Sequence, residues 1–471
     1  MGGSEFGTLA SAVDRRGCLG GIAGQPSDEV NSFGLILPQH HRMRDHVVMA
    51  LNRYWTGMEA ELRGLPIKEG PNRAVQVPLQ LVSVALPGWA AEWGVEGRVF
   101  VPAEAVGPGR GRWEEIDWWL ACFLMLECWH ERVVESTEGS IQSYSFRLEE
   151  WDSRIWDRAW LNRIALFLRE WAFQDKEAPA LPEPEIILTH DVDAVRKTVA
   201  IRIKQGLFGV FNGLKALREG SFRRAGERLR KAASFSLGSG DWWTLDKMMQ
   251  QQKTLGIRSV FHFAADKRPK TPKRWLFDPN YNIQTAALKK VFAALNDGGW
   301  VIGLHPSFDS WNKTELLEGQ RNYLQSASRS TVTWSRQHWL RFSYLDTWSA
   351  LQEAGVEIDS TLMFNDRPGF RASFAGQWRP WNPSRGEPLT LQALASVFMD
   401  SHLYDYSDLT DAEREQEIDR WLKEVETVRG RVAVLWHPQT LTTDYDWSGG
   451  YQVLLERMAS IAVKPGAIME N

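Results

Sequence analysis

A chain of 471 residues is too long for one small hydrophobic core and predicts two or three domains. Its 43% hydrophobic and 24% charged residues are ordinary for a folded protein and argue against general disorder. The formal net charge of −4 argues against a general nucleic-acid binder, and no stretch reaches the length of a membrane span.

The first part of the chain offers few functional signals. Residues 1–30 are rich in Gly and Ser, and we expect a flexible N-terminus or a remnant of cloning there. We expect a smaller α+β accessory domain at residues 31–180, with helices at 116–129 and 151–171. The three cysteines are too few for a disulfide framework, and no signal peptide is recognisable. These features favour a cytoplasmic protein with free, buried thiols; the sequence leaves its oligomeric state open.

The second part begins after a proline-rich linker near residue 180, formed by Pro179, Pro182 and Pro184. Apolar runs then alternate with helical stretches at 285–296 and 346–354, and the runs occupy residues 186–188, 259–263, 300–304, 356–359 and 432–436. This alternation is typical of an α/β domain with a parallel sheet. The basic stretch 197–231 favours a solvated helix face over a phosphate or membrane patch.

Three of these apolar runs lead directly into residues suited to catalysis. Asp191 and Asp193 follow the run 186–188, His305 follows 300–304, and His437 follows 432–436. Active sites of α/β proteins lie at the carboxyl ends of the strands, so we expect these residues to share one site.

The paired carboxylates can divide two tasks, because one can bind a cation while the other serves as a base. The alternative is a pair of turn or capping acids. His305 and Asp309 stand four residues apart, so both can ligate one divalent metal if the segment turns helically. The alternative for His305 is a hydrogen bond to the backbone at the end of a strand.

Four stretches together resemble the motifs of the polysaccharide deacetylase family, also called the NodB-homology family or carbohydrate esterase family 4. They are Thr189-His190-Asp191-Val192-Asp193, His305-Pro306-Ser307, Ser335-Arg336-Gln337-His338 and Leu435-Trp436-His437-Pro438. The resemblance covers residues 183–460 and is closer to a divergent branch that carries an uncharacterised N-terminal domain. It implies an α/β fold with a distorted (β/α) barrel at 181–471. It also implies metal-dependent hydrolysis of an N-acetyl or other acyl group on a sugar.

The resemblance also implies roles for single residues. Asp191 matches the catalytic base, Arg336 the arginine that pairs with the base, and His437 the general acid, while Asp400 is similar to an aspartate that can orient His437. Asp193 and His305 match ligands of a divalent metal, for which zinc is the first choice.

One position departs from the family pattern. The second metal-binding histidine would fall at position 309, where this chain has Asp309. Asp309 can ligate instead, His338 can supply the missing imidazole, or the metal is lost; we favour His338. Arg367, Arg371 and Trp436 are candidate substrate-binding residues, with a structural salt bridge as the equal alternative for each arginine.

Three functions stay open on this basis. A carbohydrate deacetylase is favoured over a hydrolase that cleaves the C–N bond of a non-sugar amide. A degenerate deacetylase that binds glycan without turnover is the third possibility, and it is favoured if position 309 abolishes metal binding.

Overall fold

The computed structural model of the protein describes residues 35–461, apart from 71–73, 108–110, 175, 219, 221 and 239–240 and some side chains within 199–237. Residues 1–30 and Cys18 lie outside the described residues. The largest element is one sheet of nine strands, in the order β12-β13-β3-β4-β5-β6-β7-β11-β8. Its strands are β3 (Glu185–Val192), β4 (Ser259–Phe263), β5 (Val301–Leu304), β6 (Trp334–Ser335), β7 (Ile358–Asp359), β8 (Gln377–Trp378), β11 (Gln392–Leu394), β12 (Ser396–Met399) and β13 (Arg431–Leu435).

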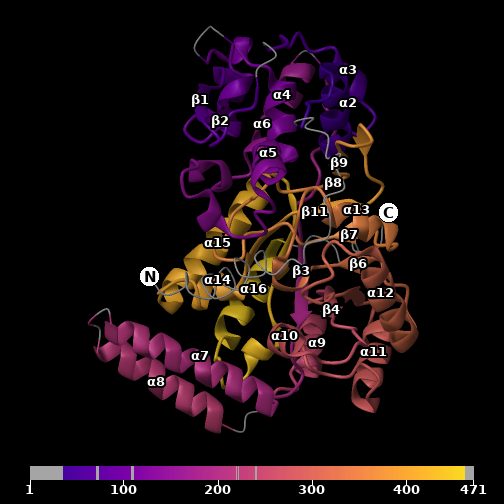
Figure 1. Ribbon diagram of the computed structural model, residues 1–471. Helices are drawn as coiled ribbons and strands as arrows, with labels where there is room; N and C mark the ends of the chain where they lie inside the picture. Colours follow the sequence, from indigo (N-terminus) through magenta and orange to yellow (C-terminus); the bar gives the residue numbers. More distant parts are fainter. Residues whose placement is uncertain are drawn as a thin grey trace, which may run out of the picture.

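Every neighbouring pair in this sheet is parallel except β11 and β8. The central strands β3, β4 and β13 are rich in apolar residues and mostly buried, as expected for parallel strands covered on both faces. The sheet is curled into a half-barrel (Figure 1). The predicted α/β fold with a distorted (β/α) barrel is therefore confirmed.

Helices alternate with these strands along the chain. They are α9 (Leu245–Thr254), α10 (Pro272–Phe277), α11 (Ala286–Gly298), α12 (Thr314–Ser328), α13 (Thr347–Glu353), α14 (Asp400–Tyr404), α15 (Asp411–Thr427) and α16 (Ser448–Ile461). Local sequence sets their ends: in α11, the Thr285 side chain accepts a hydrogen bond from Leu288 N, and Gly299 follows in the left-handed region at φ 76°. The predicted helices 285–296 and 346–354 are confirmed within a few residues.

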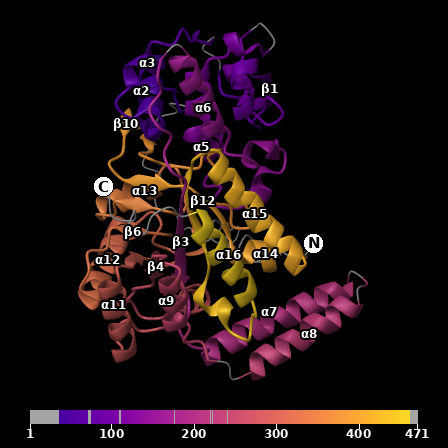
Figure 2. The same ribbon diagram turned by 180° about the vertical axis from the view of Figure 1, so that it is seen from behind.

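The N-terminal part packs at the end of the molecule opposite to a helical hairpin described below (Figures 1 and 2). It contains α2 (His40–Ala50), α3 (Glu59–Arg63), α4 (Trp118–Leu126), α5 (Trp129–Glu138), α6 (Trp160–Phe173) and the antiparallel pair β1 (Leu81–Ala85) and β2 (Arg98–Pro102). The short pair β9 (Trp381–Asn382) and β10 (Glu387–Pro388) belongs to the later part of the chain. A buried ion pair joins the two parts, since Arg163 donates to both carboxylate oxygens of Glu424 at 2.8 and 2.7 Å. One apolar core runs through both, so the division near residue 180 stays a prediction.

Two predicted helices of the N-terminal part differ from the structure. The helix expected at 116–129 is interrupted, because Cys128 adopts a left-handed φ of 46° and the Glu127 carbonyl accepts from Arg132 Nε at 2.7 Å instead of continuing the helix. The helix expected at 151–171 begins only at Trp160, after a short 3₁₀ turn at Ser153–Trp156. A side chain far away in the sequence contacts the start of the second helix, since Glu424 Oε1 accepts from Ala159 N at 3.2 Å.

Helices α7 (Val199–Arg218) and α8 (Phe222–Leu237) form a hairpin that extends away from the body (Figures 1 and 2). Two glycines allow close packing between them. A Cβ at Gly213 would lie 2.8 Å from Leu229 Cγ, and one at Gly206 would lie 2.5 Å from Ser236 Oγ.

Candidate metal and catalytic site

The strand order brings the predicted site residues to one edge of the sheet. Asp191 lies at the carboxyl end of β3 and is paired in register with His262 of β4, which in turn pairs with Gly303 of β5. His305 directly follows β5, and Arg336 directly follows β6. On the other side of β3, His437 follows β13. Adjacent parallel strands therefore deliver side chains that are far apart in sequence to one place.

Asp193, His305 and His338 form a group whose ligand atoms all lie within 4.8 Å of one another. Asp193 Oδ1 is 3.3 Å from His305 Nε2 and 3.6 Å from His338 Nε2. No described group donates a hydrogen bond to this buried oxygen. A carboxylate oxygen that faces two ring nitrogens in this way needs positive charge between them, which a ring proton or a metal cation can provide.

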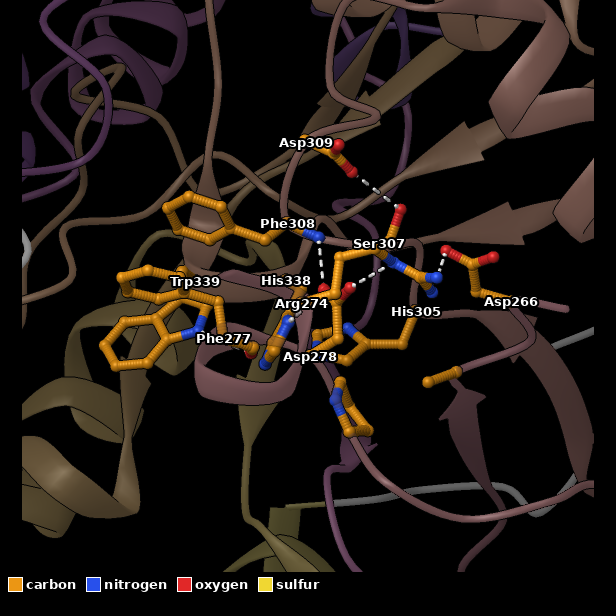
Figure 3. A network of polar contacts seen from close by, with 12 residues as sticks. Asp266, Arg274, Phe277, Asp278, His305, Ser307, Phe308, Asp309, His338 and Trp339 are labelled. Atoms are coloured by element: carbon orange, nitrogen blue, oxygen red, sulfur yellow. Dashed lines mark hydrogen bonds and ion pairs between the residues drawn. The ribbon is translucent and has the colours of Figure 1, made fainter. Parts of the chain in front are cut away.

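The partners of the two rings favour metal ligation. His305 Nδ1 lies 2.8 Å from the carbonyl oxygen of Arg336, so Nδ1 carries a proton and donates it, while Nε2 faces Asp193 and can ligate a metal once its own proton leaves. His338 Nδ1 lies 3.9 Å from Asp278 Oδ1, which places a carboxylate behind this ring as well (Figure 3). Two imidazole nitrogens and one carboxylate oxygen are a donor set that suits Zn²⁺. The residues present therefore fit the divalent metal that the sequence predicts.

The backbone around His338 explains how that ring reaches the site. The 3₁₀ turn His338–Leu340 contains two successive non-glycine residues with positive φ, Trp339 at 59° and Leu340 at 49°. Such conformations cost about 1–3 kcal/mol each and persist where surrounding contacts impose them. Trp339 Nε1 donates to Phe277 O at 3.2 Å, and Ser143 Oγ donates to Leu340 O. These contacts hold the turn that presents His338 to Asp193.

Asp309 is engaged elsewhere. Its Oδ1 accepts from Arg268 Nη2 at 3.0 Å and lies 3.4 Å from Ser307 Oγ, the contact drawn in Figure 3. It is not part of the group formed by Asp193, His305 and His338. Of the two alternatives for the third ligand, the structure brings His338 and not Asp309 to Asp193.

Asp191 is buried beside the candidate metal ligands and is surrounded by positively charged or polar side chains. Its Oδ1 lies 3.4 Å from His262 Nδ1 and 3.6 Å from Arg336 Nη1, and its Oδ2 lies 3.9 Å from His305 Nδ1. Burial opposes ionisation, but the charges of His305 and Arg336 outweigh burial and lower the pKa of Asp191. Asp191 is therefore an ionised carboxylate at neutral pH.

Arg336 is completely buried and is fixed by oxygen acceptors. Its guanidinium donates to Ser360 O at 3.0 Å, to Thr189 Oγ1 at 2.5 Å and to Ser396 Oγ at 3.1 Å. The cation is thus held in place next to Asp191, as predicted from the motif.

His437 is paired with Asp400 as predicted. His437 Nδ1 lies 2.7 Å from Asp400 Oδ1, and His437 N donates to Asp400 Oδ2 at 2.8 Å. The other ring nitrogen, Nε2, lies 3.7 Å from Asp193 Oδ2 and so points toward the candidate metal ligands. Burial lowers the pKa of His437, but the charge of Asp400 outweighs burial and raises it to about 10. His437 is therefore a protonated imidazolium at neutral pH.

No protein-family model matches the sequence, and none of the curated proteins matches it. Solved structures of polysaccharide deacetylase and carbohydrate esterase family 4 proteins do match the chain. A protein from Mycobacterium smegmatis that is assigned as a polysaccharide deacetylase matches 61% of this chain and 87% of its own, at 15% identity and a TM-score of 0.36.

A family 4 pseudoenzyme from Bacillus anthracis matches 59% of this chain and 61% of its own, at 9% identity and a TM-score of 0.27. A mutant of that pseudoenzyme with restored enzymatic activity matches 59% and 63%, at 9% identity and a TM-score of 0.28.

Three residues near the site escape sequence reasoning. His262 lies inside β4, and its contact with Asp191 follows only from the register of two strands. Asp278 directly follows α10, and its Oδ1 lies 3.9 Å from His338 Nδ1 although two helices and two strands separate the two residues in the sequence. Gln439 Nε2 donates to Asp193 Oδ2 at 3.3 Å. Of these three residues, only His262 could have been suspected from the sequence, because it is an ionisable residue within a mostly apolar strand.

The three predicted substrate-binding residues differ in how far they are buried and in what they contact. Arg371 is buried and forms an ion pair with Glu131 at 2.7 Å, so the structure favours the salt-bridge alternative for it. Trp436 is completely buried, so a substrate contact stays a prediction for this residue. Arg367 is partly exposed and stacks 4.9 Å from the ring centre of Trp156, so substrate binding stays a prediction for this residue.

Proposed function

We propose that the protein is a metal-dependent hydrolase that removes an N-acetyl or other acyl group from a sugar. The observation that carries the proposal is the meeting of Asp193, His305 and His338 around one buried, unpartnered carboxylate oxygen. The ionised carboxylate of Asp191 and the imidazolium of His437, which is paired with Asp400, lie next to this group. The sugar substrate is supported by the resemblance of the sequence motifs to those of polysaccharide deacetylases.

The residues suit the two proton transfers of amide hydrolysis. A bound metal would lower the pKa of a water molecule and polarise the acyl carbonyl. Asp191, kept ionised by Arg336, accepts the proton of the attacking water. His437, held by Asp400, donates its Nε2 proton to the leaving amine.

One observation favours a second candidate, a protein that binds glycan without turnover. The position of the family's second metal-binding histidine holds Asp309, and Arg268 engages its carboxylate at 3.0 Å. The candidate site then depends on His338, which comes from a different motif.

Metal analysis and acetate release separate the candidates. The purified chain, stripped and reloaded with Zn²⁺, is expected to bind one equivalent and to release acetate from at least one of a panel of N-acetyl sugars. Asp193→Asn is expected to abolish both, whereas the matched variant Asp309→Asn is expected to keep the metal, because Asp309 is engaged by Arg268.

Each other outcome identifies an alternative. Retained metal with release of product from a non-sugar amide alone would indicate the C–N hydrolase. Glycan binding without product from any substrate would indicate the non-catalytic protein, and loss of metal in Asp309→Asn would overturn the proposed ligand set.

A further inference from the structure

Helix α7 carries a row of exposed apolar side chains. Between 37% and 70% of the surface of each is open to solvent, and the row consists of Val199, Ile203, Leu207, Val210, Phe211, Leu214 and Leu217. Their spacing of three and four residues places them on one face of the helix. A soluble surface rarely gathers apolar side chains in this way unless they contact a partner.

The packing of the hairpin leaves this row outside. Helix α8 lies against the glycines of α7, where a Cβ at Gly213 would meet Leu229 and one at Gly206 would meet Ser236. On α8, Ala225 and Ala232 are buried at 1% and 7% exposure. The exposed row is therefore not needed to hold the two helices together.

The same hairpin is strongly basic. Residues 197–231 contain two acidic residues, Glu219 and Glu227, in a chain whose formal net charge is −4. The basic residues of this stretch are Lys197, Arg202, Lys204, Lys215, Arg218, Arg223, Arg224, Arg228, Arg230 and Lys231. A partner must therefore be anionic as well as apolar.

These two properties decide between the possible partners. A second copy of the hairpin would bring equal positive charge against the first, and a nucleic acid would leave the apolar row in water. A membrane surface with anionic lipids supplies negative charge and an apolar layer together. We propose that the α7–α8 hairpin docks this protein on anionic membranes, with the apolar row of α7 inserted at the level of the lipid headgroups.

The hairpin is fixed well enough to orient the body. Lys197 Nζ lies 2.6 Å from Asp444 Oδ1, and Trp242 Nε1 donates to Asp444 Oδ2 at 2.6 Å, so one buried carboxylate ties both ends of the hairpin. Among the described residues no helix is long and apolar enough to cross a bilayer, and the docking is interfacial. The basic stretch, expected from sequence to be a solvated helix face, thus has an apolar face that only the structure reveals.

Vesicle flotation with the full chain tests the proposal. Binding is expected to vesicles of phosphatidylcholine mixed with phosphatidylglycerol and not to phosphatidylcholine alone, and it is expected to weaken at high salt. The variant Leu207→Gln/Phe211→Gln/Leu214→Gln is expected to partition at least about tenfold less well. The matched variant Ile36→Gln/Met49→Gln/Leu345→Gln, which also replaces exposed apolar residues, is expected to bind like the parent.

Circular dichroism and turnover of a soluble substrate verify that both variants are folded. Failure of the parent to bind anionic vesicles would overturn the proposal. So would unchanged binding by the α7 variant, which would mean that charge alone is responsible, or self-association that the α7 variant abolishes, which would identify a second copy as the partner.

Discussion

At the residue scale, Gly303 of β5 determines where the ring of His262 lies. A Cβ at this position would stand 2.5 Å from His262 Cδ2, so alanine would force the ring to move. Because His262 contacts Asp191, we predict that Gly303→Ala lowers kcat by roughly ten- to a hundredfold. The overpacking should also destabilise the fold by about 1–3 kcal/mol.

Gly319 of α12 offers the matched control, since no atom of the described residues lies within 4 Å of a Cβ placed there. Gly319→Ala should leave kcat unchanged and stabilise the helix by up to about 1 kcal/mol. Steady-state kinetics and urea unfolding of the two variants provide the comparison. Equal kcat values for both would show that the position of His262 has no bearing on the reaction.

Asp400 should set the alkaline limit of activity. It raises the pKa of His437 to about 10, so the ring stays protonated far above its ordinary value of 6.5. With Asp400→Asn the pKa of His437 should fall, and the alkaline limb of the kcat profile should move to lower pH. A limb that stays in place would contradict the role of His437 as the general acid.

The same pair should make stability depend on pH. The folded-state pKa of His437 lies above its unfolded value, so its stabilising contribution is complete below about pH 6.5 and is lost as the pH rises through about 10. We predict that the free energy of unfolding of the parent falls over this range more steeply than that of Asp400→Asn. Urea unfolding at pH 7 and pH 10 measures the difference.

Sequence reasoning located the residues that directly follow apolar strands. Asp191, His305 and His437 were found in this way, because a short apolar run fixes both the strand and the position where it ends. It left open whether His338 or Asp309 approaches Asp193, since the answer depends on a strained turn at Trp339 and on the partner Arg268. Neither the strained turn nor the contact with Arg268 can be recognised from the residues next to them in the sequence.

At the element scale, one glutamine of α9 joins the sheet to the helices beside it. Gln252 Oε1 accepts from Ser259 Oγ and Trp300 Nε1, both at 2.7 Å. Its Nε2 lies 2.8 Å from His190 Nε2 and donates to Tyr451 OH at 2.9 Å. Two strands and two helices therefore depend on one buried amide.

Replacing this amide should be costly. Gln252→Leu would leave several buried polar atoms without a partner, and we predict a loss of about 3–5 kcal/mol in the free energy of unfolding. The exposed neighbour Gln250 on the same helix is the control, and Gln250→Leu should change stability by less than about 0.5 kcal/mol. Thermal or urea unfolding distinguishes them, and similar midpoints would refute the role of the buried amide.

Element boundaries in the barrel were more predictable than those in the N-terminal part. In the barrel, Thr285 and Gly299 mark the ends of α11 in the local sequence. The break between α4 and α5 at Cys128 has no such marker, because it is set by the buried Glu127–Arg132 pair, 2.6 Å apart. The spacing of apolar residues continues across this break, so the sequence pattern alone predicts one uninterrupted helix.

At the scale of the whole molecule, positive charge and exposed apolar side chains are concentrated in one part of the structure, which the overall composition does not indicate. The overall charge of −4 gives no hint that one hairpin is basic and carries an apolar row on its outer face. The fold class followed from alternating strands and helices, whereas the exposure of α7 depends on Gly206 and Gly213 facing α8. Only three-dimensional packing separates the buried seam of a hairpin from its free face.

The central claim is that Asp193, His305 and His338 hold one divalent cation. A crystal structure of the zinc-loaded protein, with anomalous diffraction at the zinc absorption edge, tests it directly. The expected result is one anomalous peak about 2.0–2.2 Å from Asp193 Oδ1, His305 Nε2 and His338 Nε2. A peak bound instead by Asp309, or no peak among these three side chains at full zinc loading, would contradict the claim.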